Sequence, residues 1–156
     1  MSYRAADRAF IESHAGAARI ALIAQSHFAL TGRHLVRGGD VADALWTLPA
    51  VVLAHGVQDD PLFFYGNRAA LDLFALRGEQ LVAMPSRLSA QAPNRAERER
   101  LLERVSRDGF IDDYAGVRIA STGQRFRIEQ AVVWNLVGDE GAPCGQAATF
   151  AHWTDL

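Results

Sequence analysis

The side chains best suited to bind a ligand lie in the C-terminal third of the chain, on segments patterned as β-strands. Residues 109–153 read as three strands joined by glycine-bearing turns, which are typical of β-hairpins. Alternation along the first strand places Tyr114 and Arg118 on one face. A guanidinium binds a carboxylate or phosphate through two parallel N–H donors. A sheet that only supports a fold has no need of such groups, so these strands are a candidate binding surface.

Three more polar residues on the next two strands extend this candidate set. Arg127 lies on the middle strand among other charged residues, whereas alternation places Gln130 among the apolar residues of the opposite face. Gln146 lies on the last strand. An amide both donates and accepts hydrogen bonds, so Gln130 and Gln146 suit a planar, heteroatom-rich ligand held in one pocket. Two alternatives stay open: the amides satisfy buried backbone groups, or the arginines pair with acids of the same strands.

The sequence lacks the usual catalytic and metal-binding motifs. Its five histidines show no HxxxH, HxH or HExxH spacing, and GxSxG, GxGxxG and phosphate-loop patterns are missing. His55 and Asp60, in the segment AHGVQDDP, have the residue types of a general base and its orienting carboxylate, with Arg118 as a third polar group. Turn segments commonly carry such residues for hydrogen bonding alone. We predict no catalytic residue and no metal site.

Composition limits the class of protein. The chain has 156 residues, 49% of them hydrophobic, and a formal net charge of -2. One domain with one core is expected at this length, and the charge offers no attraction for nucleic acid or an anionic membrane. Cys144 is the only cysteine, and no signal-peptide pattern or membrane-length apolar run is present. We therefore expect a cytoplasmic protein that binds neither nucleic acid nor membrane.

The first 40 residues predict a helical extension in front of a separate domain, residues 41–156. Apolar side chains in 4–30 gather near one face of a single helix, and Gly38-Gly39-Asp40 breaks the pattern. An exposed apolar stripe on such a helix is typical of a subunit contact. We expect a homodimer formed through this helix.

The domain itself predicts an α+β fold with a five-stranded antiparallel sheet. Two short strands near 51–54 and 62–65 precede a helix that Asn67 is placed to cap. A charged helix at 95–108 then leads into the three C-terminal strands. The helices between the second and third strands would cover one face of the sheet.

The fourth predicted strand, residues 126–137, carries apolar side chains on both sides. Strict alternation places five large ones on one side: Phe126, Ile128, Val132, Trp134 and Leu136. Ala131, Val133 and Val137 fall on the other side. Because both sides are apolar, we expect both faces of the sheet to be covered, at least in part. The N-terminal helix, either of the same chain or of a partner, would cover the second face.

Four segments of the domain resemble the MEKHLA family, a relative of the PAS domains. They are FFYGNRAALDLF, MPSRLSA, GFIDDYAGVRIASTGQRFRIEQAVVWNL and GQAATF. MEKHLA domains occur at the C-terminus of class III homeodomain–leucine-zipper plant transcription factors and as stand-alone bacterial proteins, the type that this chain resembles. The likeness covers residues 42–155 and implies a PAS-like fold with a sensory or regulatory role.

The resemblance also indicates where a ligand would bind. PAS domains commonly hold flavin, haem or a small metabolite between the sheet and the helices, and the resemblance places Arg87, in MPSRLSA, at the border of that pocket. Light-sensing flavin domains carry a cysteine on a helix, whereas Cys144 stands at the start of the last strand. Residues 94–108 lack the histidine usual for haem. The cofactor therefore stays unknown.

The leading hypothesis is a PAS-like sensory or regulatory domain that binds a small molecule, forms a homodimer, or both, and has no output module of its own. Its candidate ligand-binding residues are Gln130, Gln146, Arg118, Arg127, Arg87 and Tyr114. One alternative is a small enzyme that uses the same cavity. Another is a protein-interaction module without a ligand, its core filled by Phe63, Trp134 and Phe150.

Overall fold

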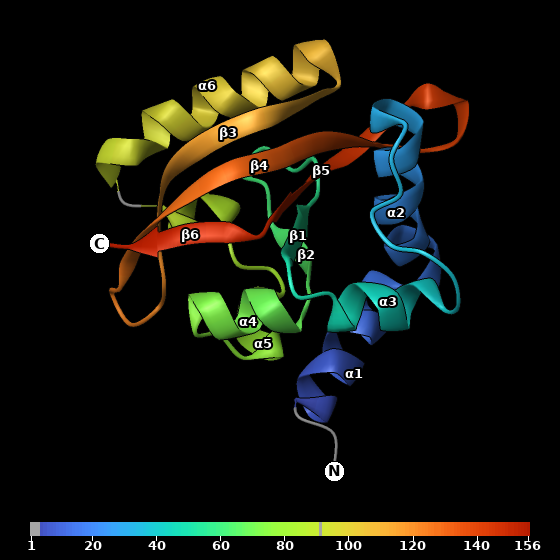
Figure 1. Cartoon of the computed structure of the whole chain (residues 1–156), viewed down its shortest axis with the longest axis horizontal. Coiled ribbons are helices and arrows are strands. Elements are labelled where there is room, and N and C mark those ends of the chain that lie inside the picture. Colours follow the sequence, from blue (N-terminus) through green and yellow to red (C-terminus); the bar gives the residue numbers. More distant parts are fainter. Residues whose placement is uncertain (1–3, 91) are drawn as a thin grey trace.

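A single antiparallel sheet with the strand order β2-β1-β5-β4-β3 forms the centre of the fold, and β6 continues β5 along β4 (Figure 1). The computed structural model describes residues 4–90 and 92–156, with their side chains except those of residues 92–95, 98 and 139. The elements in chain order are α1 (Ala5–Ala15), α2 (Ala17–Thr31), α3 (Val41–Thr47), β1 (Val51–His55), β2 (Phe63–Gly66), α4 (Arg68–Phe74), α5 (Gly78–Leu81), η1 (Ser86–Ser89), α6 (Ala92–Asp108), β3 (Phe110–Ile119), β4 (Arg125–Val137), η2 (Asp139–Gly141), β5 (Pro143–Phe150) and β6 (His152–Asp155). Within the described residues, no helix combines the length and apolar character needed to cross a bilayer.

The predicted fold class is confirmed, with one correction at the end of the chain. The five expected strands are present and antiparallel, and the turns between the last three lie where the glycines predicted them. The last predicted strand is divided, however, because Ala151 interrupts it. Its final residues form β6, a short exposed strand that pairs with the first half of β4.

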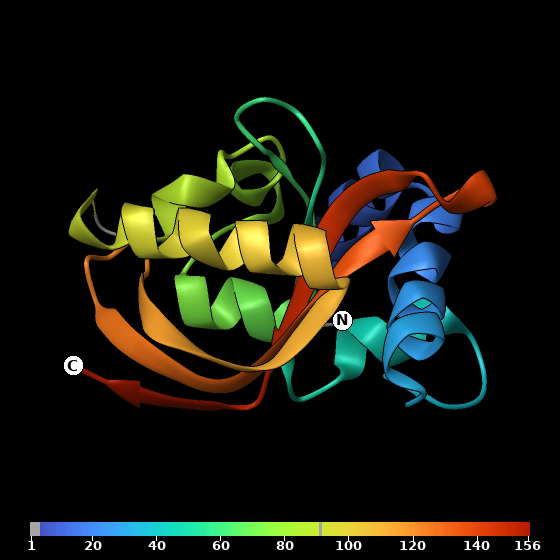
Figure 2. The ribbon, with the colours of Figure 1, turned by 90° about the horizontal axis from the view of Figure 1, so that it is seen from above.

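Helices cover both faces of the sheet. The helical segments α4, η1 and α6 lie within the curve of the sheet (Figure 2). On the other face lies α2, where Trp134 Nε1 donates to the carbonyl of Ile23 at 3.2 Å and the backbone N–H of Val137 donates to Ser26 Oγ at 3.1 Å. His27 meets the ring of Trp134 edge-on. The prediction that an N-terminal helix covers the second face is confirmed.

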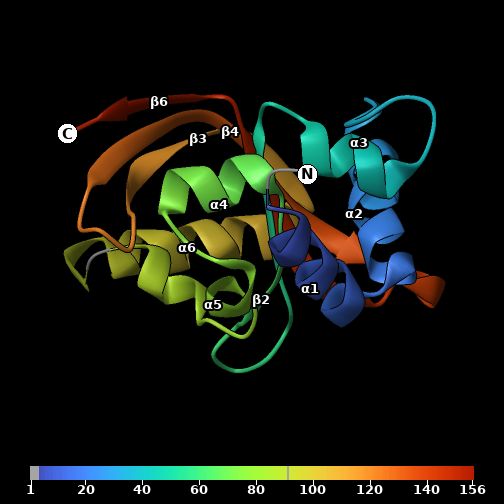
Figure 3. The same ribbon diagram turned by 90° about the horizontal axis from the view of Figure 1, so that it is seen from below.

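The N-terminal region forms two helices where one was predicted. Gly16, with φ +84°, divides α1 from α2, and a glycine adopts this backbone conformation without the Cβ clash of other residues. After this break, α1 lies beside α5 and β2 (Figure 3). The buried carboxylate of Asp7 fixes that contact, because it accepts from the backbone N–H of Gly78 at 2.8 Å, from Arg77 at 3.1 Å and from Arg4 at 3.0 Å.

The Asp7 contact should make stability depend on pH. Burial raises the pKa of Asp7, but hydrogen bonds from Gly78, Arg77 and Arg4 outweigh it and hold that pKa below its ordinary value. A depressed carboxyl pKa adds stability above the unfolded-state pKa, about 3.9, and this contribution is lost as the pH falls through the folded-state pKa. We expect Asp7→Asn to cost about 2 kcal/mol at pH 7. In urea titrations from pH 7 to pH 3, the gap between the two proteins should narrow below pH 4. A constant gap would contradict this role.

A bulge in β4 reverses which side chains face the helices. Ile128 pairs with Gly116 and Ala131 with Tyr114, so Glu129 and Gln130 together lie opposite one residue of β3. Gln130 has φ +53°, in the left-handed region. An extra residue in one strand shifts the alternation by one position.

The alternation predicted across 126–137 is therefore wrong. Phe126, before the bulge, packs edge-on against Phe74 of α4, with ring centroids 5.2 Å apart. Trp134, after the bulge, faces α2 on the opposite side of the sheet. The two side chains were predicted to share a face.

Candidate functional site

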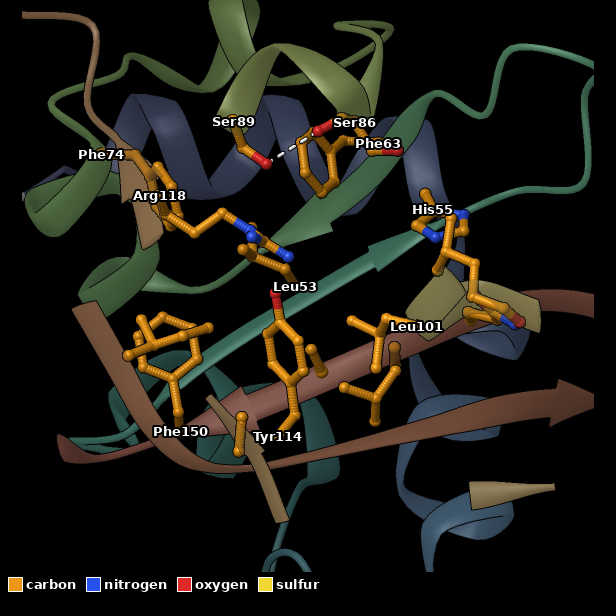
Figure 4. Close-up of a pocket in the computed structure, with 17 residues that line it drawn as sticks. Leu53, His55, Phe63, Phe74, Ser86, Ser89, Leu101, Tyr114, Arg118 and Phe150 are labelled. Atoms are coloured by element: carbon orange, nitrogen blue, oxygen red, sulfur yellow. Dashed lines mark hydrogen bonds between the residues drawn. The ribbon is translucent and has the colours of Figure 1, made fainter. Parts of the chain in front are cut away.

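A cavity of about 70 Å³ lies between the sheet and the helical segments α4, η1 and α6 (Figure 4). Its wall is mostly apolar and includes Leu53, Phe63, Ile128, Val133 and Phe150. The polar lining residues are His55, Ser86, Ser89, Tyr114, Arg118 and Gln146. The volume holds about five to seven water-sized positions and is several-fold below the roughly 300–1,000 Å³ of drug-sized ligand sites. The cavity therefore suits a ligand of few atoms.

The cavity adjoins a more open cleft of about 310 Å³. His55, Leu102 and Gln146 line both spaces, so these three residues stand between the cavity and the cleft. Val57 and Gln58, which also line the cleft, are exposed. The three shared residues thus form the boundary between the cavity and a cleft that is open to solvent.

Arg118 brings a buried positive charge to the cavity. The residue is only 8% exposed, and its Nη1 donates to the carbonyl of Val117 at 3.1 Å. Its guanidinium lies 5.2 Å from the centre of the Tyr114 ring, and its side chain reaches toward the Tyr114 hydroxyl in Figure 4. No ion pair joins it to an aspartate or glutamate in the part of the chain that the structure describes. Three acids of these strands are its candidate partners, namely Asp112, Asp113 and Glu129. Asp112 is exposed, and the other two pair with other arginines.

Tyr114 presents a buried hydroxyl that has no hydrogen-bond partner among the described residues. Its ring lies over Gly116, two positions along β3, where an added Cβ would collide with the hydroxyl. Glycine at that position therefore makes room for the tyrosine. The alternation of β3 predicted that Tyr114 and Arg118 share a face, and both line the cavity.

Gln146 combines a structural contact with an open acceptor. Its Nε2 donates to Asn135 Oδ1 at 3.0 Å and to the carbonyl of Leu102 at 3.4 Å. Asn135 Nδ2 in turn donates to the carbonyl of Val105 in α6 at 3.0 Å. The Oε1 of Gln146 is buried and has no partner among the described residues. Gln146 thus ties β5 through β4 to α6 and leaves one acceptor at the cavity.

The structure places the other three candidate residues outside the cavity lining. Gln130 is exposed on the β4 bulge, which puts Ala131 into the lining in its place. Arg127 is exposed 3.9 Å from Glu129, the ion-pair alternative considered for it. Arg87 is exposed and bound to Asp60 at 3.1 Å. Alternation fails for Gln130 because the bulge was not visible in the sequence.

No sequence pattern selects Asn135, Ser86 or Ser89. Asn135 positions Gln146, and both serines line the cavity from η1, with Ser89 Oγ donating to the carbonyl of Ser86 at 2.7 Å (Figure 4). The family resemblance placed the segment MPSRLSA at the pocket border, but it did not indicate which of its side chains points inward. The short 3₁₀ helix η1 determines that Ser86 and Ser89 line the cavity.

The residues considered for catalysis do not form one constellation. His55 lines the cavity with its Nδ1 2.9 Å from the carbonyl of Gly56, whereas Asp60 lies with Arg87 outside the lining. Cys144 is exposed and is also outside the lining. Of the residues described by the structure, no three His, Cys, Asp or Glu side chains are grouped to hold a metal ion.

A sheet with this strand order, covered by helices that enclose a small cavity, has counterparts of known family. The family model described as the MEKHLA domain matches residues 17–155. The chain belongs to the MEKHLA domain family. The match to the MEKHLA domain begins at the first residue of α2, the helix that packs on the outer face of the sheet, so the matched region includes this helix as well as the sheet.

Curated relatives of this MEKHLA domain are much longer plant proteins. It is 27% identical over 138 residues to homeobox-leucine zipper protein HOX33 of Oryza sativa subsp. indica, an alignment that covers 85% of this chain and 16% of the relative. Homeobox-leucine zipper protein HOX29 of the same subspecies is 26% identical over 145 residues, with coverage of 86% and 16%. The domain thus spans about one sixth of the length of the curated relatives it matches.

Solved structures of PAS and light-oxygen-voltage proteins share its fold. The PAS domain of a protein from Colwellia psychrerythraea gives a TM-score of 0.58 at 16% identity, covering 74% of this chain and 92% of that one. An RNA-binding light-oxygen-voltage receptor gives 0.61 at 14% identity, covering 74% and 32%. The blue-light photoreceptor Vivid gives 0.53 at 11% identity, covering 66% and 78%. The PAS-like fold expected from the resemblance is confirmed.

Proposed function

We propose that this MEKHLA domain is a sensory or regulatory domain that binds a small molecule in the cavity between its sheet and helices. One observation carries the proposal: three buried polar groups line a mostly apolar cavity, and the described residues leave each of them incompletely paired. The hydroxyl of Tyr114 and the amide oxygen of Gln146 have no hydrogen-bond partner there, and the guanidinium of Arg118 has no ion pair. A PAS-like fold, which commonly places its ligand in this position, adds support.

The energetic cost of these groups favours a ligand. Leaving a buried donor or acceptor unsatisfied costs about 1–3 kcal/mol, and folded proteins contain few such groups. Three buried side-chain atoms lack a partner within the described residues, and two of them, Tyr114 Oη and Gln146 Oε1, belong to cavity-lining residues. A bound molecule that satisfies them would recover this free energy and stabilise the closed sheet and helix arrangement.

The proposal includes a homodimer, formed through the N-terminal helices, as the route by which ligand binding acts on other molecules. Phe10 of α1 and Phe28 of α2 support it, because both are close to half exposed on helices that pack against the rest of the domain. A cytoplasmic location, expected from the sequence, belongs to the same proposal. The activities of the whole plant relatives are not part of it.

Native mass spectrometry of the protein as isolated tests both parts together. We expect an assembly of twice the chain mass, with additional mass that is released as a small molecule on denaturation. A monomer would contradict the dimer. A chain without extra mass, whose melting temperature is also unchanged by every compound of a metabolite panel, would contradict ligand binding.

Replacing Gln146 with leucine should weaken ligand binding by at least roughly tenfold, because the substitution removes the cavity's free amide acceptor. Stability should fall by only about 1–2 kcal/mol, since Asn135 Oδ1 loses its donor while the side-chain volume is kept. Thermal-shift titration with the compound released from the wild type measures both effects. Gln130→Leu is the matched control, because that glutamine lies on the exposed bulge. Equal binding by the Gln146→Leu variant and the wild type would remove Gln146 from the site.

A further inference from the structure

We infer that the ligand is a small monocarboxylate whose carboxylate binds Arg118 and the Tyr114 hydroxyl, with its short carbon chain against the apolar wall of the cavity. The inference rests on the proposed function and names the class of ligand. Its starting point is the charge of Arg118, since a guanidinium stays protonated in proteins and therefore brings a permanent positive charge into the cavity.

Among the residues that the structure describes, no carboxylate pairs with Arg118. Within the same residues, its side chain donates one hydrogen bond, to the carbonyl of Val117, and contacts the face of the Tyr114 ring. Charged side chains are almost never fully buried unless they are paired. The acids on neighbouring positions do not supply the pair, because Asp112 and Asp113 are exposed on β3. An anion in the cavity would supply it.

The lining distinguishes a carboxylate from a phosphate. A carboxylate needs two donors in one direction, which a guanidinium and a hydroxyl provide. A phosphate carries more charge and three acceptor oxygens. Binding it here would remove water from those oxygens and place them against the apolar side chains of Phe74, Ile128 and Phe150, which is unfavourable. The carboxylate leaves a carbon chain for those same side chains to cover.

The size of the cavity and the polar group at Gln146 narrow the class of monocarboxylate further. A cavity with about five to seven water-sized positions holds a carboxylate and a chain of about three to five carbons in all. Gln146 Oε1 accepts hydrogen bonds only, so it favours a hydroxyl or N–H at the far end of the chain. Gln146 also lines the open cleft, whereas Arg118 lines the cavity only, so the carboxylate at Arg118 would lie farther from the cleft than the other end of the ligand.

Four compounds of similar size test the class: butyrate, 4-hydroxybutyrate, butyramide and inorganic phosphate. We would follow them by NMR titration at constant ionic strength with the wild type, Arg118→Gln and Arg127→Gln. Arg127 is the matched control, since it lies on the neighbouring strand, is exposed and is outside the lining. Butyrate should bind at least roughly tenfold tighter than butyramide. Arg118→Gln should raise the Kd of butyrate roughly ten- to a hundredfold, whereas Arg127→Gln should leave it within about twofold.

The outcomes separate this inference from the proposed function. If butyramide binds as tightly as butyrate, or phosphate binds more tightly, the inference that the ligand is a carboxylate is overturned. The proposal that the cavity binds a small molecule would still stand. An uncharged compound released from the isolated protein would do the same. No binding by any of the four, together with no compound in the native mass spectrum, would overturn both. The comparison of butyrate with butyramide uses the wild type alone, so it holds even if Arg118→Gln does not fold.

Discussion

Replacing Asn67 with alanine is expected to destabilise the domain by about 3–5 kcal/mol, because one fully buried side chain joins five backbone groups. Its Oδ1 accepts from the N–H of Val52 at 3.0 Å and from the N–H of Ala70 at 3.1 Å. Its Nδ2 donates to the carbonyls of Leu45 at 3.0 Å, Ala50 at 2.9 Å and Leu48 at 3.4 Å. Alanine removes all of these hydrogen bonds from a site that is 0% exposed. Urea unfolding of the wild type and the variant measures the loss.

Asp40→Ala provides the matched control for a helix cap alone. Asp40 caps α3 with one hydrogen bond, to the N–H of Ala42 at 2.9 Å, and is exposed. We expect it to cost about 1 kcal/mol, the ordinary value of an N-cap. A similar loss for Asn67→Ala and Asp40→Ala would show that the contacts of Asn67 beyond its cap contribute nothing.

Replacing Gly145 with alanine should cost about 2–5 kcal/mol, through backbone strain and steric overlap together. Gly145 has φ +154°, and an added Cβ would overlap the carbonyl oxygen of His55 in the adjacent strand. Relief requires β1 and β5 to separate where His55 pairs with Gln146. Both residues lie on the boundary between cavity and cleft, so ligand binding should weaken as well. Thermal unfolding and the butyrate titration follow the two effects.

Gly123→Ala separates strain from overlap. Gly123 also has a positive φ, +91°, but nothing lies within 4 Å of an added Cβ. Its replacement should therefore cost about 1 kcal/mol, the backbone contribution alone. A loss for Gly145→Ala no greater than that for Gly123→Ala would show that the two strands relax around the methyl group at no cost.

Local pattern determined most of the fold, for reasons that particular residues illustrate. The glycine-bearing turns between the last three strands and the cap at Asn67 depend on a few adjacent residues, so their chemistry is readable from the chain. The break at Gly16 was also local but was missed, because the apolar periodicity continues across it. The order of the elements then predicted that the two groups of strands meet in one sheet, and the resemblance of four segments to the MEKHLA family supported this.

The candidate site residues also differ in how far local pattern predicted their positions. Tyr114 and Arg118 lie on an alternating part of β3, and Gln146 lies on a regular part of β5, so period-two alternation predicted their faces. Alternation misplaces Gln130, because the bulge depends on how β4 pairs with β3 and one extra residue reverses every face beyond it. Arg127 and Arg87 lie outside the cavity lining, exposed beside Glu129 and Asp60.

The sequence by itself determined the fold class, the family, and the polar residue types carried by the last three strands. The tertiary structure alone decided that a small cavity remains between the sheet and the helices. It also decided that, among the described residues, the buried Arg118 has no acid beside it and Gln146 Oε1 has no hydrogen-bond partner. The physical reason is that secondary structure follows from neighbours along the chain. Burial, pairing and empty space depend instead on residues that are distant in sequence and meet only when the sheet closes against its helices.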